Sequence, residues 1–170
     1  MEVRNPRPCG YSVPILRPAS ITCAVLLIAS LLAGCGGASK EDFRGDVVAA
    51  RNNADAGLAQ IVQATSVDDL LARMRVAAAE VRGAATDVRE AGAPDELEDE
   101  RDALADRLLA LSDEIISTVE TLEAFPEQAA STGAFNFEQW EAVQNELAKL
   151  RTQGVNVPPL ERHKPPKPQQ

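Results

Sequence analysis

Seven carboxylates between residues 95 and 106 form the densest group of chemically reactive side chains in this sequence. They are Asp95, Glu96, Glu98, Asp99, Glu100, Asp102 and Asp106. Metal sites inside helical bundles use inward-pointing Glu together with a Glu-x-x-His pair, and no histidine lies near this run. The four aspartates are spaced four, three and four residues apart, which places them on one helix face, opposite the leucines. We therefore interpret the row as a solvent-exposed surface that at most binds divalent ions loosely.

The sequence lacks the combinations of residues that catalysis usually requires. A serine or cysteine nucleophile needs a base within hydrogen-bond reach, but the single histidine, His163, lies near the C-terminal end. No glycine-rich phosphate loop follows a strand pattern. We therefore predict no catalytic residue, no cofactor-binding residue and no metal ligand. A hydrolase that relies on an acidic residue is the enzymatic alternative.

Arg75, Arg82 and Arg89 follow one another at heptad spacing beside an apolar seam. Across an antiparallel helix pair, such a row faces the acids of the next helix. We predict ion pairs of roughly 0.2–1 kcal/mol each that mainly set the register of the two helices. The alternative is an anion-binding strip for a phosphate or a charged polymer.

Cysteine placement directs attention to residue 35. Cys9 and Cys23 lie in an N-terminal segment with an arginine-containing front, an apolar run over residues 21–32 and then two small residues. These are the parts of an export signal, and the apolar run is shorter than the ~20 residues of a membrane-spanning helix. Once residues 1–34 are removed, Cys35 is the one remaining thiol and cannot form an internal disulfide.

The sequence Leu32-Ala33-Gly34-Cys35 resembles the lipobox of bacterial lipoproteins, which reads Leu, a small residue, Gly or Ala, then Cys. The resemblance covers the signal alone and implies nothing about the fold behind it. It implies cleavage between Gly34 and Cys35, a diacylglyceryl group on the Cys35 thiol and fatty acylation (palmitate, for example) of the new amino group. Two or three acyl chains attach a protein stably to a membrane, whereas a single acyl chain gives only marginal binding. An ordinary secretory signal is the alternative.

The chain that remains after cleavage is strongly acidic. It contains 14 Lys and Arg against 25 Asp and Glu, a net charge of −11. Nucleic-acid-binding domains present a basic surface, so we expect no nucleic-acid partner. The length predicts one domain.

Apolar residues recur at intervals of three and four over residues 39–154, the pattern of amphipathic helices. Ser39, followed by Asp42, is placed to cap the first helix, and Thr65-Ser66 before Val67 marks the start of the second. The second helix carries two heptad rows: Val67, Met74, Val81 and Val88, with Leu70, Ala77, Ala84 and Ala91. Its alanines allow a close approach of a neighbouring helix.

A third helix should begin at Pro94 and end near Phe125, before Pro126. A shorter fourth helix should be capped by Asn136 and stop at Gly154. No strand pattern is present, and short connections favour antiparallel neighbours. We predict an all-α fold, an antiparallel up-down bundle of three long helices plus a shorter fourth. The alternative is a three-helix coiled coil with the fourth helix packed loosely at one end.

Two segments flank the predicted bundle. Residues 35–38 form a short lipidated tether. Residues 155–170 are rich in proline and contain basic residues, which predicts an extended, disordered tail outside the core. In an alternating bundle this tail returns toward the lipid, where anionic headgroups attract basic residues.

Four aromatic residues gather around the connection between the last two helices: Phe125, Phe135, Phe137 and Trp140. We expect them to close the end of the bundle. The alternative is a partner contact formed by Phe135, Phe137 and Trp140, since exposed aromatic residues are favoured anchors at interfaces.

These observations predict an exported bacterial lipoprotein anchored at Cys35 on the extracytoplasmic face of the cell membrane. Its bundle is expected to act as a non-catalytic interaction or structural module of the cell envelope. The partner would be the bilayer itself, another envelope protein or a cell-wall polymer. The alternative is a carrier that holds a small apolar ligand between its helices.

Overall fold

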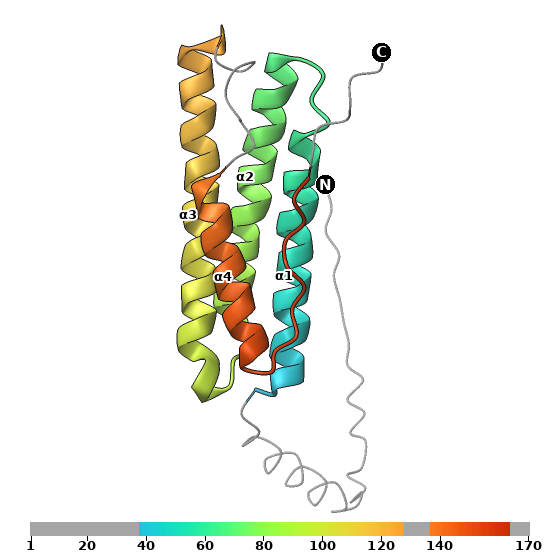
Figure 1. Cartoon of the computed structure of the whole chain (residues 1–170), viewed down its shortest axis with the longest axis vertical. Helices are drawn as coiled ribbons and strands as arrows, with labels where there is room; N and C mark the ends of the chain where they lie inside the picture. Colours follow the sequence, from blue (N-terminus) through green and yellow to red (C-terminus); the bar gives the residue numbers. More distant parts are fainter. Residues whose placement is uncertain (1–37, 128–136, 164–170) are drawn as a thin grey trace, which may run out of the picture. The chain divides into compact units, whose positions relative to one another are not determined.

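The computed structural model describes residues 38–127 and 137–163, and these form four α-helices with no strand among them. The helices are α1 (Lys40–Ile61), α2 (Val67–Glu90), α3 (Glu98–Ala124) and α4 (Glu138–Thr152), with a short 3-10 turn, η1 (Asp95–Leu97), before α3. Figure 1 shows them as a bundle of near-parallel rods. The predicted all-α architecture, three long helices and a shorter fourth, is confirmed.

The first two helices begin where serine side chains cap them. Ser39 Oγ accepts a hydrogen bond from the Asp42 amide at 3.1 Å, and Ser66 Oγ accepts one from the Asp69 amide at 3.1 Å. Each bond satisfies one of the amide groups that have no partner in the first helical turn. Both predicted start positions are confirmed.

The fourth helix is capped differently from the prediction. Asn136 lies outside the described residues, and the helix begins after Phe137, whose side chain makes no capping bond. The carboxylate of Glu114, on α3, instead accepts hydrogen bonds from the Glu138 amide at 2.7 Å and the Gln139 amide at 2.9 Å. The predicted stop is confirmed, since Gly154 has a φ of 86°, a left-handed conformation that favours glycine.

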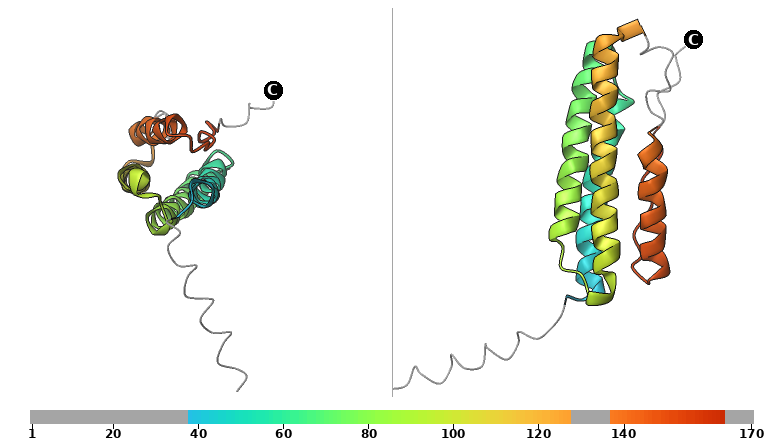
Figure 2. Two further views of the ribbon diagram at one scale, coloured as in Figure 1. Left: turned by 90° about the horizontal axis from the view of Figure 1, so that it is seen from below. Right: turned by 90° about the vertical axis from the view of Figure 1, so that its left-hand side faces the viewer.

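Each helix packs on the next one in the chain, α1 on α2, α2 on α3 and α3 on α4, and successive helices run in opposite directions (Figure 2). Three helix ends meet at one end of the bundle. Lys40, at the start of α1, lies 3.4 Å from the Glu96 carboxylate in η1. It also donates a hydrogen bond of 3.5 Å to the Gln153 carbonyl oxygen after α4. The up-down topology is thereby fixed by contacts as well as by short connections.

The heptad rows of the second helix are buried, with one exception. Met74, Val81 and Val88 are completely buried, whereas Val67 keeps 38% of its surface exposed, because it is the first residue of α2. The remaining core comes from large apolar residues on all four helices. They include Phe43, Val47, Leu58, Ile61, Leu104, Leu108, Leu111, Ile115, Leu122, Val143, Leu147 and Leu150.

The alanine row of α2 allows the close packing that the sequence predicted. Gly57 of α1 is buried against it, and a Cβ atom at that position would lie 2.8 Å from Glu80 Cβ and 3.4 Å from Ala77 Cα. On the other side of α2, the buried Ser112 hydroxyl donates a 2.9 Å hydrogen bond to the Ala78 carbonyl oxygen. Small side chains therefore set the spacing of α1, α2 and α3.

Residues 155–163, which we call the strap, form an extended segment between α4 and α1. Figure 1 shows the strap running alongside α1, and the end-on view of Figure 2 places it between α1 and α4. Val155 and Val157 are completely buried and Leu160 is 3% exposed. The prediction that this part of the tail lies disordered outside the core is therefore wrong. Its prolines prevent a helix, but an extended chain places residues 155 and 157 on one side, facing the core.

The strap also runs in the direction opposite to the one predicted. From Gly154 it passes along α1 toward the C-terminal end of that helix, so Arg162 and His163 lie beside Leu58 and Ile61. The expected return of the basic segment toward the start of α1 is thus wrong for the described residues; residues 164–170 lie outside them. Among the helices described, none is long and apolar enough to cross a membrane.

Candidate functional site

The arginine row of α2 pairs with acids of α3, as predicted. Arg82 lies 2.6 Å from the Asp113 carboxylate, and Arg75 and Arg89 pair with Glu123 and Asp106. All six side chains are about half exposed or more, so each pair contributes little stability. Since these guanidinium groups already have carboxylate partners, the row acts as a register device, and the anion-binding alternative is weakened.

The acidic row at the start of α3 is a solvent-exposed surface. Asp95, Asp99, Asp102 and Asp106 are all exposed. Asp102 accepts a hydrogen bond of 2.9 Å from Arg101, and this bond lowers the pKa of the Asp102 carboxyl. With its members facing water, the row presents no enclosed cation site.

The residues singled out from sequence as functional are only partly described. Gly34, Cys35 and Phe135 lie outside the described residues. Phe137 is 8% exposed and belongs to the core, so it offers little surface to a partner. Trp140 is half-buried and packs against the core.

A small apolar pocket opens where α1 ends and α4 begins. Leu58, Ile61, Val62, Phe137 and Trp140 line it, together with Arg162 and His163 of the strap, and its volume is ≈ 30 Å³. Ligand sites for drug-sized molecules usually measure roughly 300–1,000 Å³. The pocket has room for one or two water molecules, and it does not resemble a formed carrier site.

The strap is held by side chains from both helices that flank it. On the α4 side, Gln144 donates a 2.8 Å hydrogen bond to the Leu160 carbonyl oxygen, and Arg151 donates one of 2.9 Å to that of Val157. On the α1 side, Arg51 Nε donates a 2.9 Å bond to the Pro159 carbonyl oxygen. An extended segment has few backbone partners of its own, and these side chains supply them.

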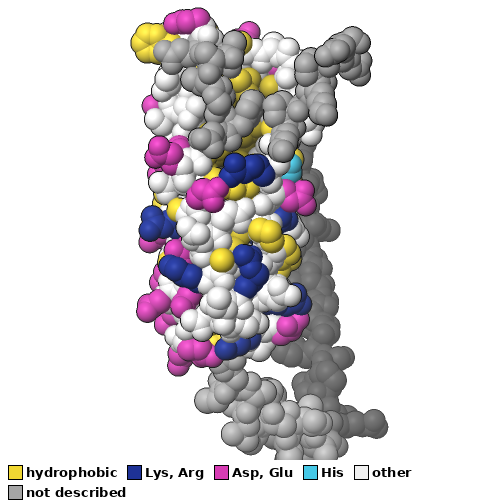
Figure 3. Space-filling view, in the orientation of Figure 1, with side chains coloured by type: hydrophobic (Ala, Val, Ile, Leu, Met, Phe, Trp, Pro, Cys, Tyr) yellow, Lys and Arg dark blue, Asp and Glu magenta, His cyan; other side chains and the backbone are white. Residues whose placement is uncertain are grey.

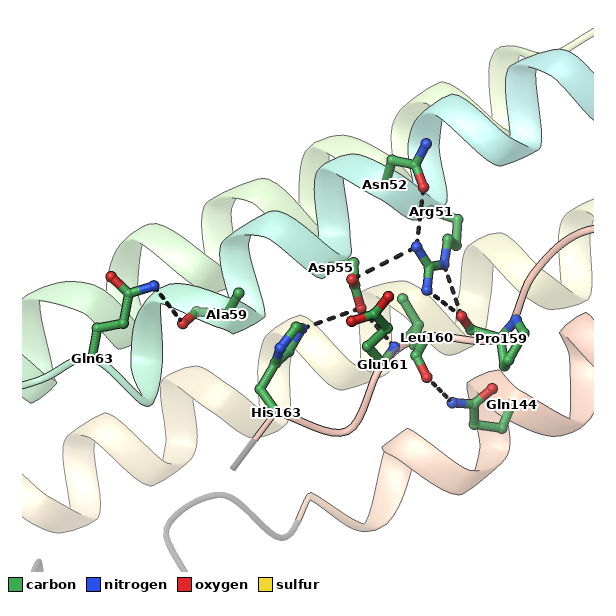
Figure 4. Close-up of polar contacts among 10 residues, drawn as sticks. All are labelled: Arg51, Asn52, Asp55, Ala59, Gln63, Gln144, Pro159, Leu160, Glu161 and His163. Atoms are coloured by element: carbon green, nitrogen blue, oxygen red, sulfur yellow. Dashed lines mark hydrogen bonds and ion pairs between the residues drawn. The ribbon is translucent and has the colours of Figure 1, made fainter. Parts of the chain in front are cut away.

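A cluster of ionisable side chains joins the strap to the middle of α1 (Figure 4). Asp55 is only 9% exposed. Its Oδ1 accepts a 2.7 Å hydrogen bond from the Glu161 amide and lies 3.4 Å from Nε2 of His163, while its Oδ2 lies 3.6 Å from Arg51. A carboxylate this deeply buried would be costly without such partners. Sequence reasoning missed this cluster because it placed His163 in a disordered tail.

A second buried carboxylate lies in an open groove between α3 and α4. Glu146 is 6% exposed; its Oε1 pairs with Lys149 at 2.9 Å, and its Oε2 has no hydrogen-bond partner. Arg107 of α3 also lines the groove. Figure 3 shows acidic and basic side chains intermixed over this side of the bundle, so the groove has no single charge that would select a ligand.

Comparison with family models, with characterised proteins and with solved structures finds no match to this chain. Functional conclusions therefore depend on the sequence and on the geometry described above. That geometry offers a stiff helical surface and one ionisable cluster where the strap meets α1.

Proposed function

We propose that the chain is an exported bacterial lipoprotein whose helical bundle is held at the membrane by a lipid on Cys35 and acts as a non-catalytic interaction or structural module. The observation that carries the proposal is the run Leu32-Ala33-Gly34-Cys35 behind an apolar stretch too short to span a bilayer. In this proposal the bilayer is the first partner, and an envelope protein or cell-wall polymer is the second.

The distance from the proposed lipid to the bundle supports a module held close to the membrane. Helix α1 begins at Lys40, so only the residues between Cys35 and Lys40 separate the anchor from the first helical turn. At about 3.3–3.6 Å per extended residue, this tether reaches under ~20 Å. The start of α1 would thus lie within about 20 Å of the lipid headgroups.

The packing of the core supports an interaction or structural module more than a ligand carrier. Large apolar residues from four helices and the strap are buried together, and alanine and glycine bring α1 and α2 into close contact. The carrier alternative has one observation in its favour, the apolar pocket beside Trp140, but its ≈ 30 Å³ is far below the volume of a typical ligand site. We therefore place the module ahead of the carrier.

The anchor is tested by cell fractionation of three chains: the natural sequence, Cys35→Ser and Cys23→Ser. The proposal expects the natural chain and Cys23→Ser in the membrane fraction, because residue 23 is not the lipid acceptor. It expects Cys35→Ser to lose its membrane attachment or to accumulate uncleaved. A Cys35→Ser chain that is cleaved at the same bond and stays membrane-bound contradicts the proposal.

The interaction role is tested by photo-crosslinking in cells. Phe125, which is 51% exposed at the end of α3, is a suitable position for the crosslinker because replacing it leaves the core intact. Asp99, on the exposed acidic row, provides a control position on the same helix. A crosslinked product of defined mass from position 125 and none from position 99 supports a localised partner contact. The absence of a crosslinked product at both positions would count against the interaction module.

A further inference from the structure

The histidine of the strap has an unsatisfied ring nitrogen. Nε2 of His163 is shielded from solvent and makes no hydrogen bond, yet it faces Asp55 Oδ1 at 3.4 Å. A neutral imidazole presents a lone pair at an unprotonated nitrogen, and a carboxylate is acceptor-only. A ring nitrogen and a carboxylate oxygen are both common metal ligands, so these two atoms are placed where they could share a cation.

A second carboxylate lies at the same place. Ligand atoms of Asp55, Glu161 and His163 all lie within 4.8 Å of one another. Glu161 is exposed, so its side chain can turn inward to shorten this separation. One imidazole nitrogen and two carboxylate oxygens form a common zinc ligand set, with bonds of about 2.0–2.2 Å.

We propose that Asp55, Glu161 and His163 bind a divalent transition-metal ion, with zinc the best match, and that this ion clasps the strap to α1. The mixed nitrogen and oxygen donors favour zinc and its neighbours over calcium or magnesium, which prefer oxygen ligands alone. Three protein ligands leave one coordination position for water. The ion joins residues 106 positions apart in the chain.

Arg51 fits this arrangement as a positioning residue. Its guanidinium lies 3.6 Å from Oδ2 of Asp55 and also donates to the Pro159 carbonyl oxygen. It thereby orients Asp55 so that Oδ1 faces the strap, as outer contacts commonly orient metal-binding carboxylates. Two carboxylates and one guanidinium leave a net charge of −1, which still attracts a divalent cation.

Metal binding is tested with the whole chain, solubilised in detergent and purified without a polyhistidine tag. Zinc uptake is measured by equilibrium dialysis, and unfolding temperatures are recorded with and without zinc chloride. The proposal expects the natural chain to bind one more zinc ion per molecule than His163→Gln does. It also expects zinc at a hundredfold excess over its dissociation constant to raise the unfolding temperature by about 5–10 °C.

Three variants make the result specific. His163→Gln and Glu161→Gln each remove one ligand, and the second keeps the buried contacts of the strap because residue 161 is exposed. Glu141→Gln removes a nearby exposed acid that pairs with Arg162 and should bind zinc normally. Any cysteine thiols are the same in all these chains, so binding to them cancels in the comparison.

The outcomes distinguish a bound metal ion from hydrogen bonds and ion pairs alone as what holds the strap on α1. Loss of one zinc in both ligand variants, with normal binding by Glu141→Gln, supports the site. Equal zinc binding by all four chains overturns it. So does a natural chain that binds no zinc, because Asp55 would then be held by Arg51 and the Glu161 amide alone.

Discussion

Gly57 and Gly45 are both residues of α1, but they have different surroundings. A Cβ atom on Gly57 would lie 2.8 Å from Glu80 Cβ, whereas one on Gly45 would have nothing within 4 Å. Alanine is favoured over glycine within helices by about 1 kcal/mol. Sequence patterns treat the two glycines alike, and only the packing distinguishes them.

We therefore expect alanine substitutions of opposite sign. Gly45→Ala should raise the free energy of unfolding by about 0.5–1 kcal/mol. Gly57→Ala should lower it by about 1–2 kcal/mol, because overpacking against α2 outweighs the gain in helix propensity. Urea unfolding of both variants provides the measurement, and a stabilised Gly57→Ala would show that α1 and α2 do not pack as closely as described.

Asp69 gives the start of α2 a dependence on pH. Its carboxylate accepts a 2.9 Å hydrogen bond from the Thr65 amide and a 2.8 Å bond from Arg73. The bond from the Thr65 amide, with a further contribution from Arg73, lowers the pKa of Asp69 below its ordinary value of 3.8. A carboxyl with a lowered pKa in the folded state stabilises the fold above its unfolded-state pKa, and this contribution is lost as the pH falls through the folded-state value.

Substituting Asp69→Asn should therefore destabilise the protein at pH 7 and have a smaller effect below pH 3.8. Asparagine keeps an acceptor for the Thr65 amide but has no charge to lose. The comparison is made by thermal unfolding of both proteins over a pH series. A constant difference in unfolding temperature down to the lowest pH would show that the charge of Asp69 does not contribute.

At the scale of elements, α4 depends on a cap that belongs to another helix. The Glu114 carboxylate of α3 accepts both first amides of α4. Glu114→Ala should lower the free energy of unfolding by about 1–2 kcal/mol, near the upper range for loss of a helix cap. Glu120→Ala, an exposed position on the same helix, is the control and should stay within ~0.5 kcal/mol. Equal effects in urea unfolding would argue against the capping role.

The strap contributes buried apolar surface between α1 and α4 (Figure 2). Leu160→Ala should lower the free energy of unfolding by about 2–5 kcal/mol, as for other buried leucines. Asn156→Ala, an exposed position between two buried valines, should change it by less than ~0.5 kcal/mol. A Leu160→Ala protein as stable as the natural protein would show that the strap does not contribute to the core.

Helix positions were predictable from sequence because their signals are local. Ser39, Ser66 and Gly154 mark helix ends through their own side chains or backbone, and the arginine row of α2 specified its register on α3. The strap was not predictable in this way. Its burial depends on a gap between α1 and α4 that exists only in the folded bundle, and its carbonyl groups are satisfied by Arg51, Gln144 and Arg151 from elsewhere in the chain.

The ionisable cluster was missed for the same reason. Asp55 reads in sequence as one polar residue of an amphipathic helix, and His163 as one residue of a proline-rich tail. They meet only because the strap turns back at Gly154 and follows α1 upward (Figure 1). Long-range contacts of this kind leave no periodic signal in a single sequence.

At the scale of the whole molecule, the bundle and its proposed anchor have separate physical origins. The fold arises from amphipathic helices, small residues at their contacts and the strap. The proposed anchor would arise from the lipobox-like run Leu32 to Cys35. An acidic bundle has no intrinsic affinity for an anionic membrane surface, so the membrane attachment in our proposal depends on the lipid alone.

The most direct test of the proposal is the intact mass of the protein isolated from bacterial membranes, with sequencing of its first residues by mass spectrometry. Our account predicts a chain that begins at Cys35 and carries the added mass of a diacylglyceryl group, with or without a third acyl chain. A chain that begins at Met1, or one that begins at Cys35 with a free thiol, would contradict it.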